Sequence, residues 1–294
     1  MSFNTLGLSP ELKQAIESKG YTDPSEIQQQ AIPSILQGND IMAGAQTGTG
    51  KTAAFALPIL QRLQNDESKR RRVRTLVLVP TRELASQVGD SFRSYGKNLR
   101  FRTSTLYGGV SIRTQIDKLK KGVDIVVATP GRLLDHLDKK TLDLSELEVF
   151  VLDEADRMLD MGFIRDIKKV LKYLPEKKQN LLFSATFPKE IQTLANNLLN
   201  SPKKIQVAAS NSTADKVIQV IYPVDKSRKR ELLAHCIKEE GWFQVLVFSR
   251  TKHGANKLAS QLNKVGIDAN AFHGNKSQSQ RTRALKDFKD AKTQ

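Results

Sequence analysis

The sequence of 294 residues contains one cysteine, Cys236, and no long apolar run. A single cysteine excludes an intramolecular disulfide and argues against a cysteine-based zinc site. The longest apolar runs, at 76–79 and 245–248, are far shorter than the roughly 20 residues that a membrane-spanning helix needs. The first residues show no cationic segment leading into an apolar stretch, as a secretion signal would. We therefore expect a cytoplasmic protein that does not enter a membrane.

Positive charge, in contrast, is abundant. The chain has 47 Lys and Arg against 31 Asp and Glu, a formal net charge of +16 at pH 7. This excess predicts affinity for a polyanion, either nucleic acid or an anionic membrane surface. A content of 39% hydrophobic and 27% charged residues is typical of globular rather than disordered chains. The length indicates about two domains.

Short apolar segments alternate with longer amphipathic ones. Ser9 and Pro10 predict the start of a helix that ends at Gly20, and a second helix is expected between Pro24 and Gly38. Strands are predicted at 40–43, 75–79, 102–106, 124–128, 148–152, 180–183 and 204–207. Several of them are continuous runs of Val, Ile and Leu, as expected where helices cover both faces of a sheet. The alternation predicts an α/β fold with a doubly wound, mainly parallel sheet.

Residues 208–216 are small and polar without an apolar period, which indicates a linker. Beyond them the alternation resumes, with strands predicted at 217–222, 244–248 and 269–272 and helices at 229–239, 252–265 and from about 279. We therefore expect a first domain at 1–207 and a second at 217–294. The second has only three strand–helix units, so we expect that residues are missing at its C-terminus.

The segment between the first strand and the next helix has the pattern of a phosphate-binding loop. It reads Ala45, Gln46, Thr47, Gly48, Thr49, Gly50, Lys51 and Thr52. Its glycines allow backbone N–H groups to converge on phosphate oxygens, and the helix N-terminus adds its positive dipole end. Lys51 is expected to reach the β and γ phosphates, and the Thr52 hydroxyl to bind Mg²⁺. The alternative is a glycine-rich turn with a solvated lysine.

A run of acids, Asp153, Glu154 and Asp156, follows the apolar strand at 148–152. Asp153 is expected to hold Mg²⁺ through water, and Glu154 to orient the attacking water. The alternative is a group of acids that only stabilises a helix start. A phosphate-binding loop elsewhere in the chain favours the metal role, because a nucleoside triphosphatase also needs an acidic residue that binds magnesium.

Residues 153–156 spell Asp-Glu-Ala-Asp, and the chain resembles the DEAD-box ATP-dependent RNA helicases of superfamily 2, most closely the bacterial RhlE-type branch. The resemblance extends over essentially the whole chain. It implies a RecA-like domain at 1–207 and an incomplete second RecA-like domain after the linker. It also implies ATP and Mg²⁺ as cofactors and RNA as the partner.

By the same resemblance, residues 20–28 correspond to a motif that recognises adenine. Gln28 would hydrogen-bond the adenine edge, Tyr21 would pack on its face, and Phe3 would support the pocket. A side-chain amide suits this role because it offers a donor and an acceptor together. Ser25 and Glu26 stand where the family more often has Thr-Pro. The alternative is a glutamine on a surface helix.

Three predicted strands end in segments that resemble the RNA-contacting motifs of the family. These residues are Pro80, Thr81, Arg82, Gly108, Gly109, Thr129, Pro130, Gly131 and Arg132. Ligands of open α/β sheets lie at the carboxyl ends of the strands, and backbone contacts fix RNA without reading its sequence. Ordinary turns and helix caps are the alternative. In the second domain, Gln278 and Arg281 resemble an RNA-facing segment that begins at His273, to which we assign no proton-transfer role.

The resemblance gives Ser184 and Thr186 a coupling role, through hydroxyl bonds to the acidic motif at Asp156. On sequence alone they indicate a helix N-cap. The basic run at 69–74 is interpreted as a solvated loop, and Trp242 as a packing residue rather than a platform for bases.

The later motifs of the family, which supply arginines to the phosphoryl-transfer transition state, do not occur in the sequence. Such an arginine is worth about 10³–10⁵ in rate in related enzymes. The expected parent function is RNA-stimulated ATP hydrolysis coupled to local unwinding of short RNA duplexes. This chain is expected to bind ATP but hydrolyse it very slowly. The alternatives are a non-catalytic, ATP-gated RNA clamp or assembly platform, and a DNA translocase of the same superfamily.

Overall fold

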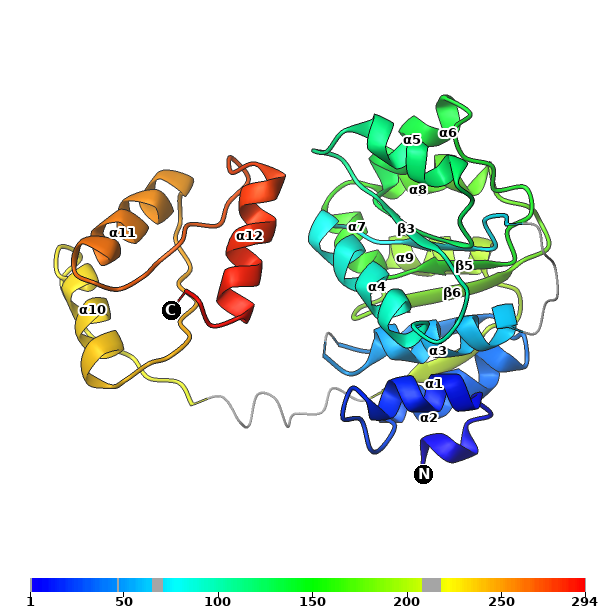
Figure 1. Cartoon of the computed structure of the whole chain (residues 1–294), viewed down its shortest axis with the longest axis horizontal. Coiled ribbons are helices and arrows are strands. Elements are labelled where there is room, and N and C mark those ends of the chain that lie inside the picture. Colours follow the sequence, from blue (N-terminus) through cyan, green and yellow to red (C-terminus); the bar gives the residue numbers. More distant parts are fainter. Residues whose placement is uncertain (1, 47, 65–70, 208–217, 294) are drawn as a thin grey trace. The chain divides into compact units, whose positions relative to one another are not determined.

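The computed structural model describes residues 2–46, 48–64, 71–207 and 218–293. The chain divides into two compact units, Met1–Asn211 and Ser212–Gln294 (Figure 1). Their boundary falls within the predicted linker, which lies outside the described residues, as do Thr47 and the basic residues 69 and 70. None of the helices in the described ranges combines the length and apolarity that crossing a bilayer requires.

A single sheet forms the centre of the first unit. Its strands are β1 (Ile41–Gly44), β2 (Thr75–Leu78), β3 (Thr103–Leu106), β4 (Ile125–Ala128), β5 (Val149–Leu152), β6 (Gln179–Ser184) and β7 (Lys203–Gln206). The strand order is β3-β4-β2-β5-β6-β1-β7, and each neighbouring pair is parallel. The predicted parallel sheet is therefore confirmed, with every predicted strand within one residue of its observed ends.

Helices connect these strands. They are η1 (Phe3–Thr5), α1 (Pro10–Glu17), α2 (Glu26–Leu36), α3 (Lys51–Gln64), α4 (Arg82–Tyr95), α5 (Ile112–Lys120), α6 (Pro130–Asp138), α7 (Ala155–Asp160), α8 (Ile164–Leu171) and α9 (Lys189–Leu198). The predicted start of α1 is confirmed, because the Ser9 hydroxyl accepts a hydrogen bond from the backbone N–H of Leu12. Pro10 occupies the first helical position, where its missing N–H has no intrahelical partner to lose.

The two faces of the sheet belong to two different hydrophobic clusters. Val77 and Val151 point into a cluster with α1 to α4, whereas Leu76 and Phe150 point into a cluster with α6 to α9. This separation follows from the two-residue period of a strand, which sends neighbours to opposite faces. Figure 1 shows α1, α2 and α3 on one side of the strands and α6 and α8 on the other. Burial on both faces explains the continuous apolar runs of the sequence.

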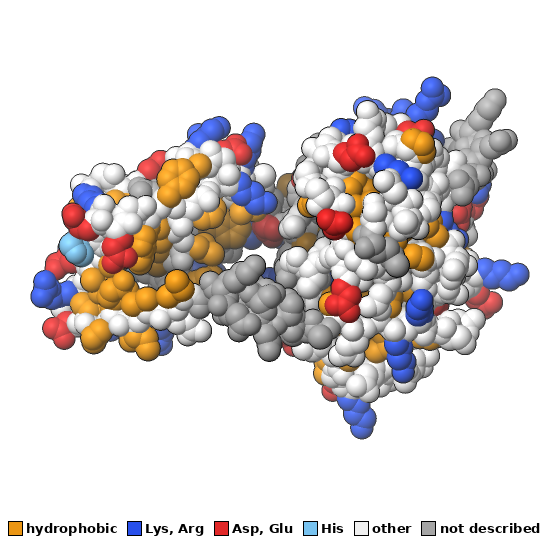
Figure 2. Space-filling view, turned by 90° about the horizontal axis from the view of Figure 1, so that it is seen from below, with side chains coloured by type: hydrophobic (Ala, Val, Ile, Leu, Met, Phe, Trp, Pro, Cys, Tyr) orange, Lys and Arg blue, Asp and Glu red, His pale blue; other side chains and the backbone are white. Residues whose placement is uncertain are grey.

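In the second unit the helices agree with prediction but the strands do not. The helices are α10 (Lys229–Glu239), α11 (Lys252–Lys264) and α12 (Gln278–Lys289). The strands predicted at 217–222, 244–248 and 269–272 are wrong, since none of the described residues of this unit is in a strand. A strand needs a hydrogen-bonded neighbour and a covered apolar face. Here Ile218, Ile221 and Phe248 are each at least 90% exposed, and Figure 2 shows hydrophobic side chains gathered on this unit.

The described core of the second unit is small. It consists of Ile237, Leu262 and Ile267, with partly buried apolar side chains packed around it. Trp242 is one of these surrounding side chains, which confirms its interpretation as a packing residue.

Phe55 on α3 provides a test of the core of the first unit. It is fully buried, with its ring centroid 5.3 Å from that of Phe183 and 6.2 Å from that of Phe92. We expect Phe55→Ala to lower the free energy of unfolding of this unit by about 3–5 kcal/mol, because the cavity cannot fully collapse. Urea unfolding followed by circular dichroism measures the change. Met161→Ala, at a side chain that is 47% exposed, is the control and should cost less than about 1 kcal/mol; equal losses would contradict the burial of Phe55.

Candidate functional site

The phosphate-binding loop lies between β1 and α3 at the carboxyl edge of the sheet. Lys51 is 7% exposed, and its Nζ donates a 2.9 Å hydrogen bond to the carbonyl oxygen of Ala45. Gly48 and Gly50 have φ of +88° and +92°, which favours glycine. The solvated-lysine alternative is therefore wrong. The Lys51 ammonium is buried and bonds to the backbone of the loop.

The adenine-motif segment docks directly on this loop. The Ser25 hydroxyl donates to the carbonyl of Thr49 at 2.8 Å, and Gln28 Nε2 donates to the carbonyl of Gly50 at 3.2 Å. Gln28 Oε1 accepts from the backbone N–H of Ser25 at 3.0 Å, which completes a capping box at the start of α2. A Cβ on Gly50 would lie within 2.4 Å of Gln28 Nε2, so the close approach requires glycine. Gln28 is 7% exposed and is not a surface glutamine.

The two aromatic residues predicted for the adenine pocket lie in different surroundings. Phe3 is 6% exposed and belongs to the core cluster of α1 to α4. Tyr21 is 48% exposed. Burial, followed by the charge of Tyr21 and a hydrogen bond shared with it, raises the pKa of Tyr95. Tyr21 is thus tied to α4 while leaving much of its side chain accessible.

Asp153 follows β5, next but one to β1 in the sheet, and is 3% exposed. Burial raises its pKa from 3.8 to about 6, and the positive charge of Lys51 partly opposes this rise. The backbone N–H of Glu154 donates to Asp153 Oδ1 at 2.9 Å. A buried carboxylate with an elevated pKa favours a neighbouring cation.

These residues fit a magnesium ion held together with nucleotide phosphates. The Thr52 hydroxyl and the Asp153 carboxylate are hard oxygen donors, the ligand type that Mg²⁺ prefers. Among the described residues, no group of three or more His, Cys, Asp or Glu side chains is arranged to hold a metal by itself.

Glu154 adopts a left-handed backbone conformation, with φ of 53° and ψ of 51°. Such a conformation is uncommon for a residue other than glycine, and strained backbones of this kind cluster at functional sites. Its side chain is 12% exposed and lies 3.3 Å from the Arg157 guanidinium. The turn at Glu154 separates β5 from α7 and presents the acids at the sheet edge.

The hydroxyl bonds predicted between Ser184, Thr186 and the acidic motif are present. Ser184 Oγ accepts from the backbone N–H of Asp156 at 3.1 Å, and Asp156 Oδ2 accepts from the N–H and the hydroxyl of Thr186 at 2.8 and 3.0 Å. Burial raises the pKa of Asp156, but the hydrogen bonds from Thr186 and from the backbone N–H of Arg157 outweigh it and lower that pKa. The N-cap alternative is wrong, because the N-cap of α9 is Pro188. Ser184 also contacts the phosphate-binding loop, since its carbonyl accepts from Ala45 N–H at 3.1 Å.

Two of the predicted RNA segments meet at the same edge. Gly109 has φ of +80°, and a Cβ there would lie 2.0 Å from a guanidinium nitrogen of Arg82, so Arg82 lies directly against the loop after β3. Thr81 caps α4 by accepting from the N–H of Leu84 at 3.2 Å. Thr129 and Pro130 begin α6, and both are nearly buried. Gly131 lies in the first turn of the same helix and is exposed.

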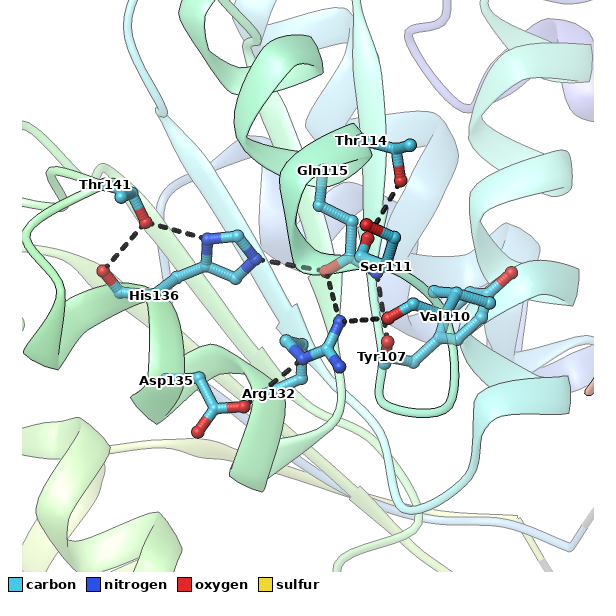
Figure 3. Close-up of polar contacts among 9 residues, drawn as sticks. All are labelled: Tyr107, Val110, Ser111, Thr114, Gln115, Arg132, Asp135, His136 and Thr141. Atoms are coloured by element: carbon cyan, nitrogen blue, oxygen red, sulfur yellow. Dashed lines mark hydrogen bonds and ion pairs between the residues drawn. The ribbon is translucent and has the colours of Figure 1, made fainter.

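Arg132 is turned inward. Its side chain is 11% exposed and bonds to the Val110 carbonyl, to Gln115 and to Asp135 (Figure 3). Sequence reasoning missed Gln115 and the buried His136 that contacts it. The only available signal was a polar residue on the apolar face of each helix.

Gln278 and Arg281 both lie on α12, in the second unit, where Arg281 hydrogen-bonds Gln278. Gln278 is 9% exposed.

The described part of the basic run lies in a loop in which Arg71 is exposed, but the interpretation as merely solvated is wrong for Arg74. Arg74 is 7% exposed and forms two hydrogen bonds to the carboxylate of Glu148. Arg71 pairs with Asp124 at 2.7 Å, and Arg72 pairs with Glu146 at 2.9 Å. The acids that neutralise these arginines are distant in sequence, so the run itself could not reveal them.

Comparisons with known proteins agree with this geometry. A family model described as DEAD/DEAH box helicase matches residues 25–194, and one described as helicase conserved C-terminal domain matches residues 228–294. The DEAD-box ATP-dependent RNA helicase RhpA of Helicobacter pylori is 42% identical over 288 residues, covering 98% of this chain and 58% of the relative. CshA of Bacillus cereus, of the same description, is 43% identical over 289 residues, covering 98% and 54%. The chain thus spans little more than half the length of these relatives.

Among solved structures, the crystal structure of a DEAD box protein from Methanococcus jannaschii matches with a TM-score of 0.67 and 41% sequence identity, covering 100% of this chain and 78% of that chain. The predicted fold class, an α/β RecA-like domain followed by a second RecA-like domain, is confirmed. The sheet order, the motifs at its carboxyl edge and these matches agree, and the chain belongs to the DEAD/DEAH box helicase family.

Proposed function

We propose that this chain binds ATP, Mg²⁺ and RNA as part of an ATP-dependent RNA helicase. The observation that carries the proposal is the junction at one sheet edge, where Ser184 contacts both the phosphate-binding loop and the acidic motif. The assignment to the RhlE-type branch and to the cytoplasm is also proposed, from sequence resemblance.

In the nucleotide site, each residue has a role that follows from its chemistry. Backbone N–H groups of the phosphate-binding loop after Ala45 and the Lys51 ammonium hold the phosphates. Thr52 and Asp153 hold Mg²⁺, which supplies positive charge to the phosphates when bound. Glu154 orients the attacking water. Gln28 has one Nε2 hydrogen beyond its bond to Gly50, and can exchange that bond for the adenine edge when nucleotide enters.

Coupling between nucleotide and RNA follows from the same contacts. A change at the phosphates reaches Asp156 through the short turn after Asp153, and Asp156 holds Thr186 by two hydrogen bonds. RNA is expected to lie along the segments after β2, β3 and β4, where Arg82 and exposed backbone contact phosphates without reading sequence. A 2′-hydroxyl contact would give the preference for RNA over DNA.

The chain is proposed to bind ATP but to turn it over slowly. The sequence contains the water-orienting Glu154 but lacks the arginine motifs that stabilise the transition state in this family. The alternative of an ATP-gated RNA clamp predicts the same binding with no hydrolysis at all. A single-turnover measurement separates them, because a clamp leaves bound ATP intact.

Lys51→Ala tests the nucleotide site. Loss of a buried ammonium that contacts phosphate should weaken ATP binding at least about tenfold, since such charge-assisted bonds are worth about 1.5–3 kcal/mol. Isothermal titration calorimetry with ATP and Mg²⁺ measures the affinity. Lys204→Ala, at an exposed lysine on β7, serves as the control. Equal affinities for Lys51→Ala and the parent protein would refute the nucleotide assignment.

Asp153→Asn tests how much burial of the Asp153 carboxylate lowers the free energy of unfolding. Since the pKa is raised from 3.8 to about 6, the folded protein binds the proton more tightly than the unfolded chain, and stability falls as pH rises through this window. Without nucleotide or metal, Asp153→Asn should therefore raise the free energy of unfolding by about 1–3 kcal/mol at pH 7.5. Below pH 4 the gain should vanish. Urea unfolding at both pH values checks this, and a gain that does not depend on pH would contradict the assigned cause.

Steady-state ATP hydrolysis tests the activity of the chain. We expect turnover at least about 10³-fold below that of an intact relative, with saturating RNA, because the arginine contribution is absent. Glu154→Gln in the same chain sets the background. Turnover equal to that of the intact relative would show that the missing motifs are not required.

A further inference from the structure

A buried polar cluster joins α5, α6 and the loop after β3. Its central side chains are Gln115, which is 5% exposed, and His136, which is fully buried (Figure 3). Buried polar groups in native proteins are almost always hydrogen-bonded, and this requirement fixes the geometry of both side chains.

The amide of Gln115 has only one possible orientation. Its Nε2 donates to the carbonyl of Tyr107 at 3.0 Å, so its Oε1 is the acceptor for the Arg132 guanidinium at 3.0 Å. His136 Nε2 lies 3.0 Å from that same Oε1 and must therefore carry a hydrogen. The other ring nitrogen, Nδ1, lies 2.8 Å from the Thr141 hydroxyl, which also lies 3.1 Å from the His136 carbonyl. Burial, and next the charge of Arg132, lower the pKa of His136, which agrees with a neutral ring.

Arg132 connects the hydrogen-bonded Gln115–His136 pair to the loop after β3. It donates to the Val110 carbonyl at 3.1 Å, and its Nε lies 3.3 Å from Asp135 on its own helix. The loop itself has little apolar anchoring, since Val110 is 38% exposed and Gly109 is exposed. A loop with few apolar contacts depends on its polar tethers for a single conformation. The tethers to Tyr107 and Val110 bracket the two glycines that lie against Arg82.

We propose that Gln115, supported by His136, is a positioning residue for RNA binding. It holds Arg132 against Val110 and so fixes the glycine loop beside Arg82. Arg132 acts on RNA through this loop rather than through its own charge. The inference rests on the proposed RNA-binding function.

Substitutions of Arg132 distinguish an indirect role, in which its guanidinium positions the glycine loop, from a direct contact between its charge and an RNA phosphate. Arg132→Lys keeps the charge but loses the planar guanidinium that bridges Val110 and Gln115. The probe is a fluorescein-labelled single-stranded oligouridine, measured by anisotropy at several salt concentrations with a non-hydrolysable ATP analogue and Mg²⁺. We expect Gln115→Ala, Arg132→Lys and Arg132→Gln each to weaken binding about tenfold, with an unchanged dependence on salt. Affinity for the ATP analogue should stay at the parental value in Gln115→Ala.

Asn197→Ala, which removes an exposed amide on α9, is the matched control and should bind RNA like the parent protein. The proposal is overturned if Gln115→Ala also binds like the parent. It is equally overturned if Arg132→Lys binds normally while Arg132→Gln weakens binding and lowers the salt slope by about 1, because that is the signature of a direct phosphate contact.

Amide hydrogen exchange tests, without RNA, whether Gln115 and Arg132 hold the loop after β3 in one conformation. In Gln115→Ala, exchange across residues 107–111 should be at least about tenfold faster, while the core of α3 keeps its parental rate. Unchanged exchange in this loop would show that Gln115 does not hold it in place. If the parent protein binds no RNA, the proposed function is refuted, and the RNA role of Gln115 with it. The exchange rates would still decide whether Gln115 and Arg132 hold the loop after β3.

Discussion

The electrostatic relation between Asp153 and Lys51 is the constraint on which the site depends. Both side chains are more than nine-tenths buried at the carboxyl edge of the sheet, where an isolated charge is costly. Attraction to Lys51 offsets part of the burial that raises the pKa of Asp153. Burial of the Asp153 carboxylate is unfavourable for the protein alone, and the proposed Mg²⁺ and ATP would supply compensating charges. The sheet must keep both strands in register for the two groups to remain within reach of each other.

Several polar side chains at this edge do two tasks. Gln28 caps α2 and contacts the phosphate-binding loop, and Asp156 lies in the first turn of α7 while holding Thr186. Such shared use links local helix geometry to the site. Gly50 shows how close the packing is, because any side chain there would displace Gln28.

Net positive charge is an incomplete predictor of RNA binding in this chain, because several arginines form internal ion pairs. Arg71, Arg72 and Arg74 pair with acids from elsewhere in the first unit, and the inward Arg132 bonds to carbonyl and amide groups. Guanidinium groups suit these roles because they remain charged and donate in several directions. The excess charge of the sequence therefore overstates the number of cations available to the proposed RNA partner.

The sequence by itself determined the strands of the first unit, its parallel sheet, the helix starts and the residues of the phosphate and acidic motifs. These depend on local patterns: short continuous apolar runs between amphipathic segments, capping residues and glycines with positive φ. Only the tertiary structure decided that Gln115 and His136 hold Arg132, that the basic run is paired, and that the expected strands of the second unit do not form. Each of these depends on partners that are distant in the chain, and a local pattern carries no information about which distant group will satisfy a buried donor or pair with a strand.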